Sequence, residues 1–137
     1  MKLILQFQTW KNKTTNNIHK YTLIYINFFL SILMIIIQWN INGYINNYDN
    51  LEILIKKYKP DIVVLQETHV PMNIKRKHPN QYHIYFHNTQ NQSKQGLAFM
   101  IKKNIHHSLL DQNLPVNYQI QSFKVQMAQE LLIQNIY

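Results

Sequence analysis

Residues 60–69 read Pro60-Asp61-Ile62-Val63-Val64-Leu65-Gln66-Glu67-Thr68-His69. The uninterrupted apolar run at residues 62–65 is typical of a β-strand buried on both faces, as in the parallel sheet of an α/β protein. The proline ends any preceding helix, because the residue before a proline avoids the helical conformation. The stretch therefore predicts a central strand that carries an acidic side chain, Glu67, at its carboxyl end.

An amphipathic pattern precedes this strand. Leu51, Leu54, Ile55 and Tyr58 recur at positions i, i+3, i+4 and i+7, which is the spacing of one apolar helix face. Acidic residues lie near the start of the segment and lysines near its end, which suits the helix dipole. We therefore predict a short helix that ends before Pro60 and connects two parallel strands.

Residues 21–37 form an uncharged, almost wholly apolar run for which two interpretations remain open. The run reaches the lower end of the roughly 17–25 residues that span a bilayer as a helix, and lysines precede it as in a signal anchor. Alternatively, residues 33–39 form a buried strand, and the residues before them are a leader. If residues 33–39 pair beside residues 62–65, the membrane interpretation fails.

The rest of the chain is typical of a β-meander. Alternating polarity at residues 82–87 and apolar runs at residues 96–101, 120–127 and 131–137 predict four strands. The polar segments between them predict turns. Together with the strand–helix–strand unit, this pattern indicates an α/β fold.

Polar side chains follow both strands of the predicted parallel pair. Asn40 and Asn42 follow the first strand, and Glu67 follows the second. A strand–helix–strand unit returns a parallel neighbour, so we expect these three side chains at one edge of the sheet. A glutamate at a buried strand end is a good ligand for a hard cation such as Mg²⁺, and asparagine amides can orient a phosphate or a water.

Two sequence motifs, in the order in which they occur along the chain, resemble those of a known family. The segments are Ile36-Ile37-Gln38-Trp39-Asn40-Ile41-Asn42-Gly43 and residues 58–69. They resemble the start of the endonuclease/exonuclease/phosphatase superfamily and, more narrowly, the endonuclease domain of non-LTR (LINE-type, jockey-like) retrotransposons. Residues 96–103 and 132–137 are similar to two later strands of that family. The resemblance covers residues 33–137 and implies a four-layer α/β sandwich of the DNase I-like type.

The resemblance implies roles for four residues. Asn40 matches an asparagine that forms hydrogen bonds within the catalytic pocket, and Glu67 matches the metal-binding glutamate. Asn42 stands where an asparagine is usual on the retrotransposon side, and Tyr137 matches a tyrosine near the scissile phosphate. The implied reaction is the hydrolysis of a DNA phosphodiester, which nicks one strand and leaves a 3′-hydroxyl. The implied cofactor is Mg²⁺, with Mn²⁺ as the alternative cation.

The sequence departs from the family in its second half. The family supplies an Asp-x-Asn motif and a Ser-Asp-His motif that includes the general base in its second half. The Ser-Asp-His motif does not occur in this chain, and the one Asp-x-Asn, at residues 111–113, precedes the strand at residues 132–137 and does not follow it. We therefore expect residues 33–137 to be the N-terminal half of the domain, with residues 1–32 outside it. We expect one sheet plus a short helix, an uncovered apolar face and no catalytic activity.

The charge of the chain fits DNA but does not select it. There are 14 Lys+Arg against 6 Asp+Glu, a net charge of +8. The 20 isoleucines, 17 asparagines and 13 lysines all have A/T-rich codons, so codon bias explains part of the charge. Lys75, Arg76 and Lys77 lie in a basic loop that suits the DNA backbone and a solvated loop equally.

Several other site classes are excluded. The absence of cysteine excludes disulfide frameworks, zinc–thiolate sites and thiol nucleophiles, and the two glycines exclude glycine-rich phosphate loops. His83 and His87 share a strand face, but at ~3.3 Å per residue they lie too far apart to chelate one ion. We interpret His106 and His107 as a surface turn.

Three functional classes remain open on the sequence. The first is a remnant of a retroelement DNA endonuclease, and the second is a nucleic-acid-binding module without catalysis. The third is a single-pass membrane protein that spans the bilayer through residues 21–37. The first two classes place the chain in the nucleus or cytoplasm.

Overall fold

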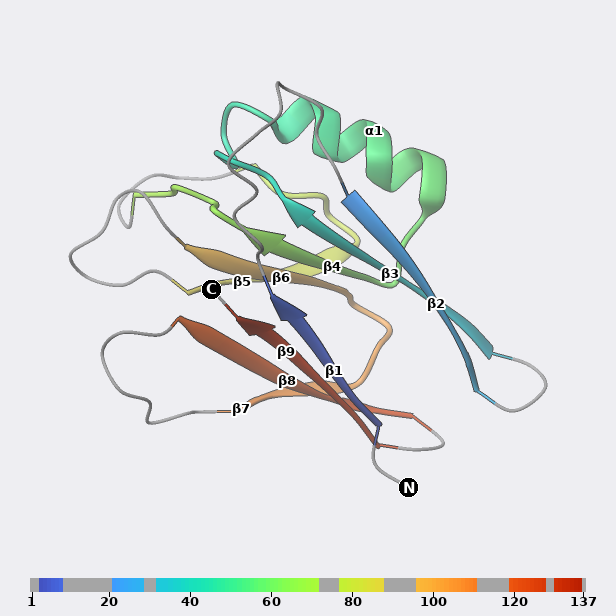
Figure 1. The fold of residues 1–137 in the computed structure, drawn as a ribbon. Coiled ribbons are helices and arrows are strands. Elements are labelled where there is room, and N and C mark those ends of the chain that lie inside the picture. Colours follow the sequence, from blue (N-terminus) through green and yellow to red (C-terminus); the bar gives the residue numbers. More distant parts are fainter. Residues whose placement is uncertain are drawn as a thin grey trace.

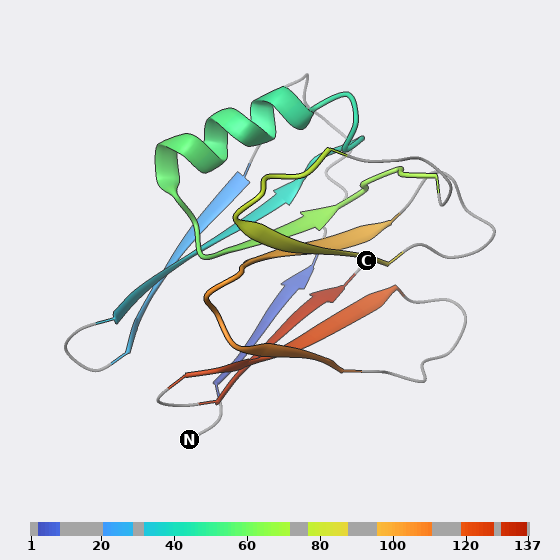
Figure 2. The same ribbon diagram turned by 180° about the vertical axis from the view of Figure 1, so that it is seen from behind.

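The computed structural model describes residues 3–8, 21–28, 32–71, 77–87, 96–110, 119–127 and 130–136. Within them, a five-stranded sheet has the order β2-β3-β4-β6-β5 and a four-stranded sheet the order β1-β9-β8-β7. The helix α1 covers the outer face of the five-stranded sheet, and the four-stranded sheet faces its other side (Figures 1 and 2). In chain order the elements are β1 (Leu3–Gln8), β2 (Tyr21–Phe28), β3 (Ile32–Asn40), α1 (Tyr48–Tyr58), β4 (Ile62–Gln66), β5 (Tyr82–His87), β6 (Leu97–Lys102), β7 (His107–Leu110), β8 (Ile120–Gln126) and β9 (Glu130–Ile136).

Strands β3 and β4 form the parallel pair that the sequence predicts. Their register runs from Ile36 opposite Ile62 to Asn40 opposite Gln66. Every residue of β4 is buried, because β3 and β6 flank it in the sheet and packed layers cover both faces. The predicted α/β class is therefore confirmed.

The crossover between β3 and β4 is α1. Its buried side chains, Leu51, Leu54 and Ile55, pack on the outer face of the five-stranded sheet. The helix ends at Lys59, which adopts a left-handed conformation with φ 48° and donates its N–H to the carbonyl of Ile55 at 2.8 Å. Pro60 then directs the chain into β4, as the sequence predicts.

The apolar run at residues 21–37 forms strands wherever the structure describes it. Strand β2 pairs antiparallel with β3, and β3 pairs with β4. The interpretation of this run as a membrane-spanning helix is therefore wrong. Tyr25 and Leu33 are 57% and 51% exposed, whereas Ile36 and Ile37 are buried. Among the described residues, no helix has the length and apolarity needed to cross a membrane.

A second sheet covers the face that we expected to be open. Strand β9 pairs with β8 and, in parallel, with β1, and β7 pairs with β8. Apolar side chains from both sheets, including Val64, Phe99, Phe123 and Ile133, form one core between them. The expectation of an uncovered apolar face is wrong, because the predicted meander divides between two sheets and β1 joins the second. The domain boundary at residue 33 stays a prediction.

One histidine that we interpreted as part of a surface turn begins a strand. His107 starts β7, and its Nε2 lies 2.8 Å from the hydroxyl of Tyr85 on β5. Its Nδ1 lies 2.7 Å from the carbonyl of Ile105, and its ring packs against Phe123. The ring therefore joins the two sheets, which a solvated turn residue would not do. His106 is exposed.

Candidate functional site

The loops that follow β3 and β4 run side by side. The amide of Ile41 donates to the carbonyl of Gln66 at 3.0 Å, and the amide of Gly43 donates to the carbonyl of Glu67 at 2.8 Å. The amide of Tyr44 donates to the carbonyl of Thr68 at 2.8 Å. The parallel pairing thus continues beyond both strands. It brings the backbones of Asn40, Asn42 and Glu67 to one edge of the sheet, where open α/β sheets place their sites.

Backbone strain is concentrated at this edge. Three residues other than glycine have positive φ there: Asn42 at 46°, Glu67 at 53° and His69 at 49°. A left-handed conformation costs a residue with a side chain about 1–2 kcal/mol. Gly43 and Gly96 also have positive φ, and the amide of Thr68 donates to the carbonyl of Gly96 at 3.1 Å. The hydrogen bonds between the loops hold Glu67 in its strained conformation.

The side chain of Asn47 braces the first of these loops. Its Nδ2 donates to the carbonyl of Ile41 at 2.9 Å and reaches the carbonyls of Asn42 and Gly43 at 3.3 Å. Asn47 stands at the N-cap of α1 but makes no side-chain capping bond to the helix. It therefore stabilises the loop rather than the helix, a role that the sequence analysis did not predict.

Two buried oxygen atoms at this edge have no hydrogen-bond partner among the described residues. They are Oδ1 of Asn40 and Oγ1 of Thr68. A buried acceptor without a partner is costly and uncommon in folded proteins, and such an atom is available to a ligand. Amide and carboxylate oxygens are the ligands that Mg²⁺ prefers, so Asn40 and Glu67 fit a hard divalent cation.

The described part of the chain supplies few further ligands for a metal ion. It contains no group of three or more His, Asp or Glu side chains that could hold one. The edge therefore offers one carboxylate, from Glu67, and the amide oxygen of Asn40. The other ligands of a bound cation would be water, substrate oxygens or groups outside the described residues.

The remaining predicted site residues are divided between the described and undescribed parts of the chain. Tyr137, Lys75 and Arg76 lie outside the described residues. Lys77 is exposed, and its carbonyl accepts a hydrogen bond of 2.8 Å from the hydroxyl of Tyr44. Tyr44 itself lies in the loop after β3, so the end of the basic loop is tied to the candidate site through this tyrosine.

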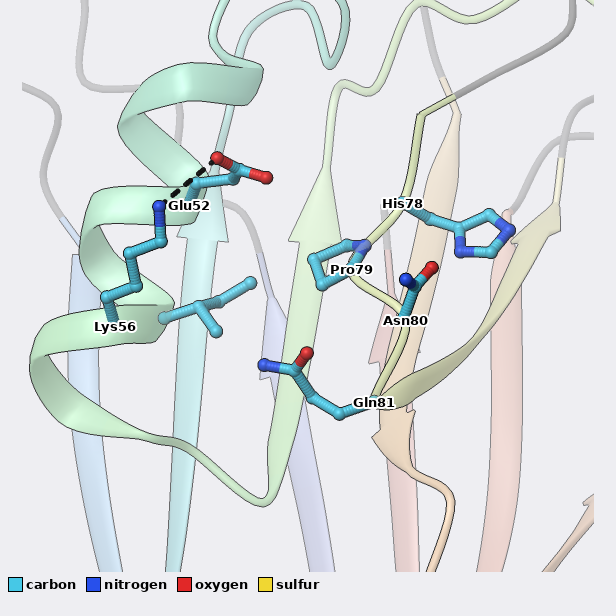
Figure 3. A pocket seen from close by; sticks show the side chains of 7 residues that line it. Glu52, Lys56, His78, Pro79, Asn80 and Gln81 are labelled. Atoms are coloured by element: carbon cyan, nitrogen blue, oxygen red, sulfur yellow. Dashed lines mark ion pairs between the residues drawn. The ribbon is translucent and has the colours of Figure 1, made fainter.

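A cavity of about 270 Å³ lies elsewhere, between α1 and the segment that leads into β5 (Figure 3). Its polar lining includes Glu52 and Lys56 of α1, which form an ion pair of 3.5 Å. Across from them are His78 and Asn80. None of the residues that line it is a predicted site residue, so the cavity and the candidate site are separate.

Comparison with known proteins identifies the family. The model of the endonuclease/exonuclease/phosphatase family matches residues 37–136, a range that runs from β3 to β9 and contains Asn40, Asn42 and Glu67. No curated protein sequence matches the chain. The family is one of nucleases and phosphatases that hydrolyse phosphoesters, generally with a divalent metal ion. Because the match covers most of the chain and includes strands of both sheets, the protein belongs to the endonuclease/exonuclease/phosphatase family.

Proposed function

We propose that this chain is part of a Mg²⁺-dependent DNA endonuclease domain of the kind found in non-LTR retrotransposons. In this proposal Glu67 binds the cation, Asn40 contacts the reacting phosphate group and Asn42 supports the loop between them. The observation that supports it most is the strained Glu67, with φ 53°, directly after β4, the strand that pairs with the strand of Asn40. The buried Oδ1 of Asn40 has no hydrogen-bond partner among the described residues. Strain that the surrounding structure maintains is common at functional sites.

The chemistry at this edge suits a phosphodiester. A bound Mg²⁺ would stabilise negative charge on a phosphate oxygen. The amide of Asn40 can present its Oδ1 to a water or a cation and its Nδ2 to a phosphate oxygen. A carboxylate such as that of Glu67 attracts a cation but repels a bare phosphate. The carboxylate and the phosphate therefore need the cation between them.

DNA is the proposed substrate because the motifs at residues 36–43 and 58–69 resemble those of retrotransposon endonucleases. The net charge of +8 is compatible with this substrate. Lys77, at the end of the basic loop, is tied to the candidate site through Tyr44. Lysine and arginine side chains contribute to DNA affinity by neutralising phosphates and releasing counterions. Lys75, Arg76 and Lys77 are the proposed contacts.

We further propose that these 137 residues do not cleave DNA by themselves. The sequence contains no Ser-Asp-His motif, so these 137 residues lack the general base of the family. Without a base to deprotonate the attacking water, a bound cation and a positioned phosphate give little hydrolysis. The chain alone would then act as a nucleic-acid-binding module.

Nicking of supercoiled plasmid in Mg²⁺ tests this proposal, with Glu67→Ala as the matched variant. We expect the 137 residues to shift DNA in a gel at low salt and to leave the plasmid supercoiled. Nicking that is lost in Glu67→Ala would contradict the proposed inactivity and support the endonuclease assignment. Absence of both nicking and DNA binding would contradict the nucleic-acid role.

The coding sequence that follows Tyr137 tests the retrotransposon origin. Translation in all frames is expected to give a Ser-Asp-His motif and then reverse-transcriptase sequence. Downstream sequence that encodes a different kind of domain would contradict this origin while leaving the family unchanged.

A further inference from the structure

A buried polar side chain crosses between the two sheets close to the candidate site. Asn135 of β9 is fully buried, and its Nδ2 donates to the carbonyl of Leu65 on β4 at 2.9 Å. Its Oδ1 accepts a hydrogen bond of 3.1 Å from Nε2 of Gln66, the next residue of β4. One carboxamide from the four-stranded sheet therefore holds two consecutive residues of the five-stranded sheet.

The contact continues into β3. Oε1 of Gln66 accepts a hydrogen bond of 3.1 Å from Nε2 of Gln38. Gln66 is also fully buried, and its Nε2 lies 3.5 Å from the carbonyl of Ile136. Three carboxamides thus form a continuous chain from β3 through β4 to β9. We call Gln38, Gln66 and Asn135 the amide chain.

The amide chain lies beside the apolar core that the two sheets share. The core there consists of aliphatic and aromatic side chains such as Ile36, Val64 and Phe123. Burying two amides in such surroundings costs free energy unless their hydrogen bonds are made, and a satisfied network fixes one arrangement of the strands. The amide chain therefore gives this end of β4 a defined geometry that apolar packing alone would not impose.

The two residues that Asn135 contacts directly precede the candidate metal ligand, Glu67. Leu65 and Gln66 are the last two residues of β4, and Glu67 follows them with φ 53°. Gln66 also pairs with Asn40 in the β3–β4 register. Any rotation of the Gln66 backbone would redirect both the carbonyl and the side chain of Glu67.

We propose that Asn135 is a positioning residue: by anchoring Leu65 and Gln66 from the opposite sheet, it holds Glu67 in the strained conformation that binds the divalent cation. The cation-binding part of this inference rests on the proposed function, whereas the anchoring part does not. Removal of residues that orient a metal ligand through hydrogen bonds commonly weakens metal affinity by about 10–100-fold.

The neighbouring strand offers a matched control. Gln121 of β8 stands directly opposite Asn135 in the β8–β9 register and is 4% exposed. Its Nε2 donates to the carbonyl of Tyr85 on β5 at 3.0 Å. Gln121→Ala therefore removes the same kind of buried bond between the sheets, but from a strand that does not lead to Glu67.

Amide hydrogen exchange tests the anchoring without any metal. The amide of Gly43 donates to the carbonyl of Glu67, and the amide of Lys102 donates to the carbonyl of Asp61 at the other end of β4. We expect Asn135→Ala to speed exchange at Gly43 by about tenfold relative to Lys102, and Gln121→Ala to leave this ratio within about twofold. The same ratio in both variants would overturn the anchoring. If Asn135→Ala fails to fold, Gln66→Met is used in its place, because it breaks the amide chain at β4.

Titration with Mn²⁺, followed by the electron paramagnetic resonance of the free ion, tests the consequence for the cation. We expect Asn135→Ala to weaken binding by about tenfold and Gln121→Ala to leave it within about twofold. Unchanged binding in Asn135→Ala, with binding lost in Glu67→Gln, would overturn the positioning role and leave the proposed function standing. Equal binding by the wild type and Glu67→Gln would contradict the proposed function and the cation-binding part together, while hydrogen exchange still decides the anchoring.

Discussion

The two ends of β4 each carry an acidic residue, but the structure uses them in opposite ways. At the amino end, Oδ2 of Asp61 accepts the amide of Ile35 at 2.8 Å, and Oδ1 pairs with the ammonium of Lys102 at 2.8 Å. At the carboxyl end, Glu67 has φ 53° and directly follows Gln66, the residue that pairs with Asn40. The buried Oδ1 of Asn40 has no partner among the described residues. Asp61 is not among the described residues with positive φ.

The carboxylate of Asp61 stabilises the fold, whereas the carboxylate of Glu67 belongs to a residue with a strained backbone conformation. Asp61 ties β3, β4 and β6 together through its side chain and backbone. Glu67 instead adopts a strained backbone conformation, in which its carbonyl accepts the amide of Gly43 from the neighbouring loop. Substitutions at the two ends should therefore have opposite effects on stability and on cation binding.

The largest effect on stability is expected at the amino end. Asp61→Ala should lower the free energy of unfolding by about 3 kcal/mol, because it leaves the amide of Ile35 without its partner and removes a charge-assisted hydrogen bond. Urea denaturation measures the change. A loss below about 1 kcal/mol would mean that Asp61 does not stabilise the fold as described.

A smaller effect is expected from the tyrosine that supports the same end. Tyr82 is buried, and its hydroxyl donates to the carbonyl of Pro60. Tyr82→Phe should lower the free energy of unfolding by about 1 kcal/mol at neutral pH. Thermal or urea denaturation checks this value.

The same tyrosine predicts a dependence on pH. Burial, with a contribution from the charge of Asp61, raises the pKa of Tyr82 in the folded state. The unfolded chain therefore loses this proton first, and stability should fall as the pH rises above about 10, toward the folded-state pKa. The fall should be shallower in Tyr82→Phe than in the wild type. Parallel curves for the two proteins would show that Tyr82 does not ionise differently on unfolding.

At the carboxyl end, a substitution that relieves the backbone strain should raise the free energy of unfolding instead of lowering it. Glycine adopts positive φ without the steric cost that alanine and glutamate share, so Glu67→Gly should be more stable than Glu67→Ala by about 1 kcal/mol. Both variants lack the carboxylate, so the difference between their free energies of unfolding, measured by urea denaturation, reports the backbone strain alone. If the alanine variant is the more stable, the backbone at Glu67 is not strained.

The central features of the fold could be predicted from the sequence because their patterns are local. The helix follows from the spacing of Leu51, Leu54 and Ile55, and β4 follows from its apolar run. Strand β2 could not be separated from a membrane segment, since a chain rich in isoleucine makes an edge strand almost as apolar as a buried one. The second sheet depends on β1 pairing with β9, a contact between the two ends of the described chain that no local pattern encodes.

The candidate site could be predicted only in part. The motifs indicated Asn40, Asn42 and Glu67, and the parallel pairing brings their backbones to one edge. The positive φ of Glu67 could not be predicted, because glutamate has no preference for that conformation. The bond from Gln66 to Asn135 joins residues 69 positions apart, and neither amide stands in a pattern that indicates a partner. Such contacts follow from the packing of the two sheets.

The most direct test of the central claim is a nuclear magnetic resonance titration of the protein with Mn²⁺, which broadens amide signals close to the bound ion. We expect the signals of Asn40, Gly43 and Glu67 to broaden first, while those of Asp61 and Ile62 remain sharp. Glu67→Gln should remove the broadening and change the free energy of unfolding by less than about 1 kcal/mol. Broadening that centres on Asp61, or that persists unchanged in Glu67→Gln, would contradict the assignment of the carboxyl end of β4 as the cation site.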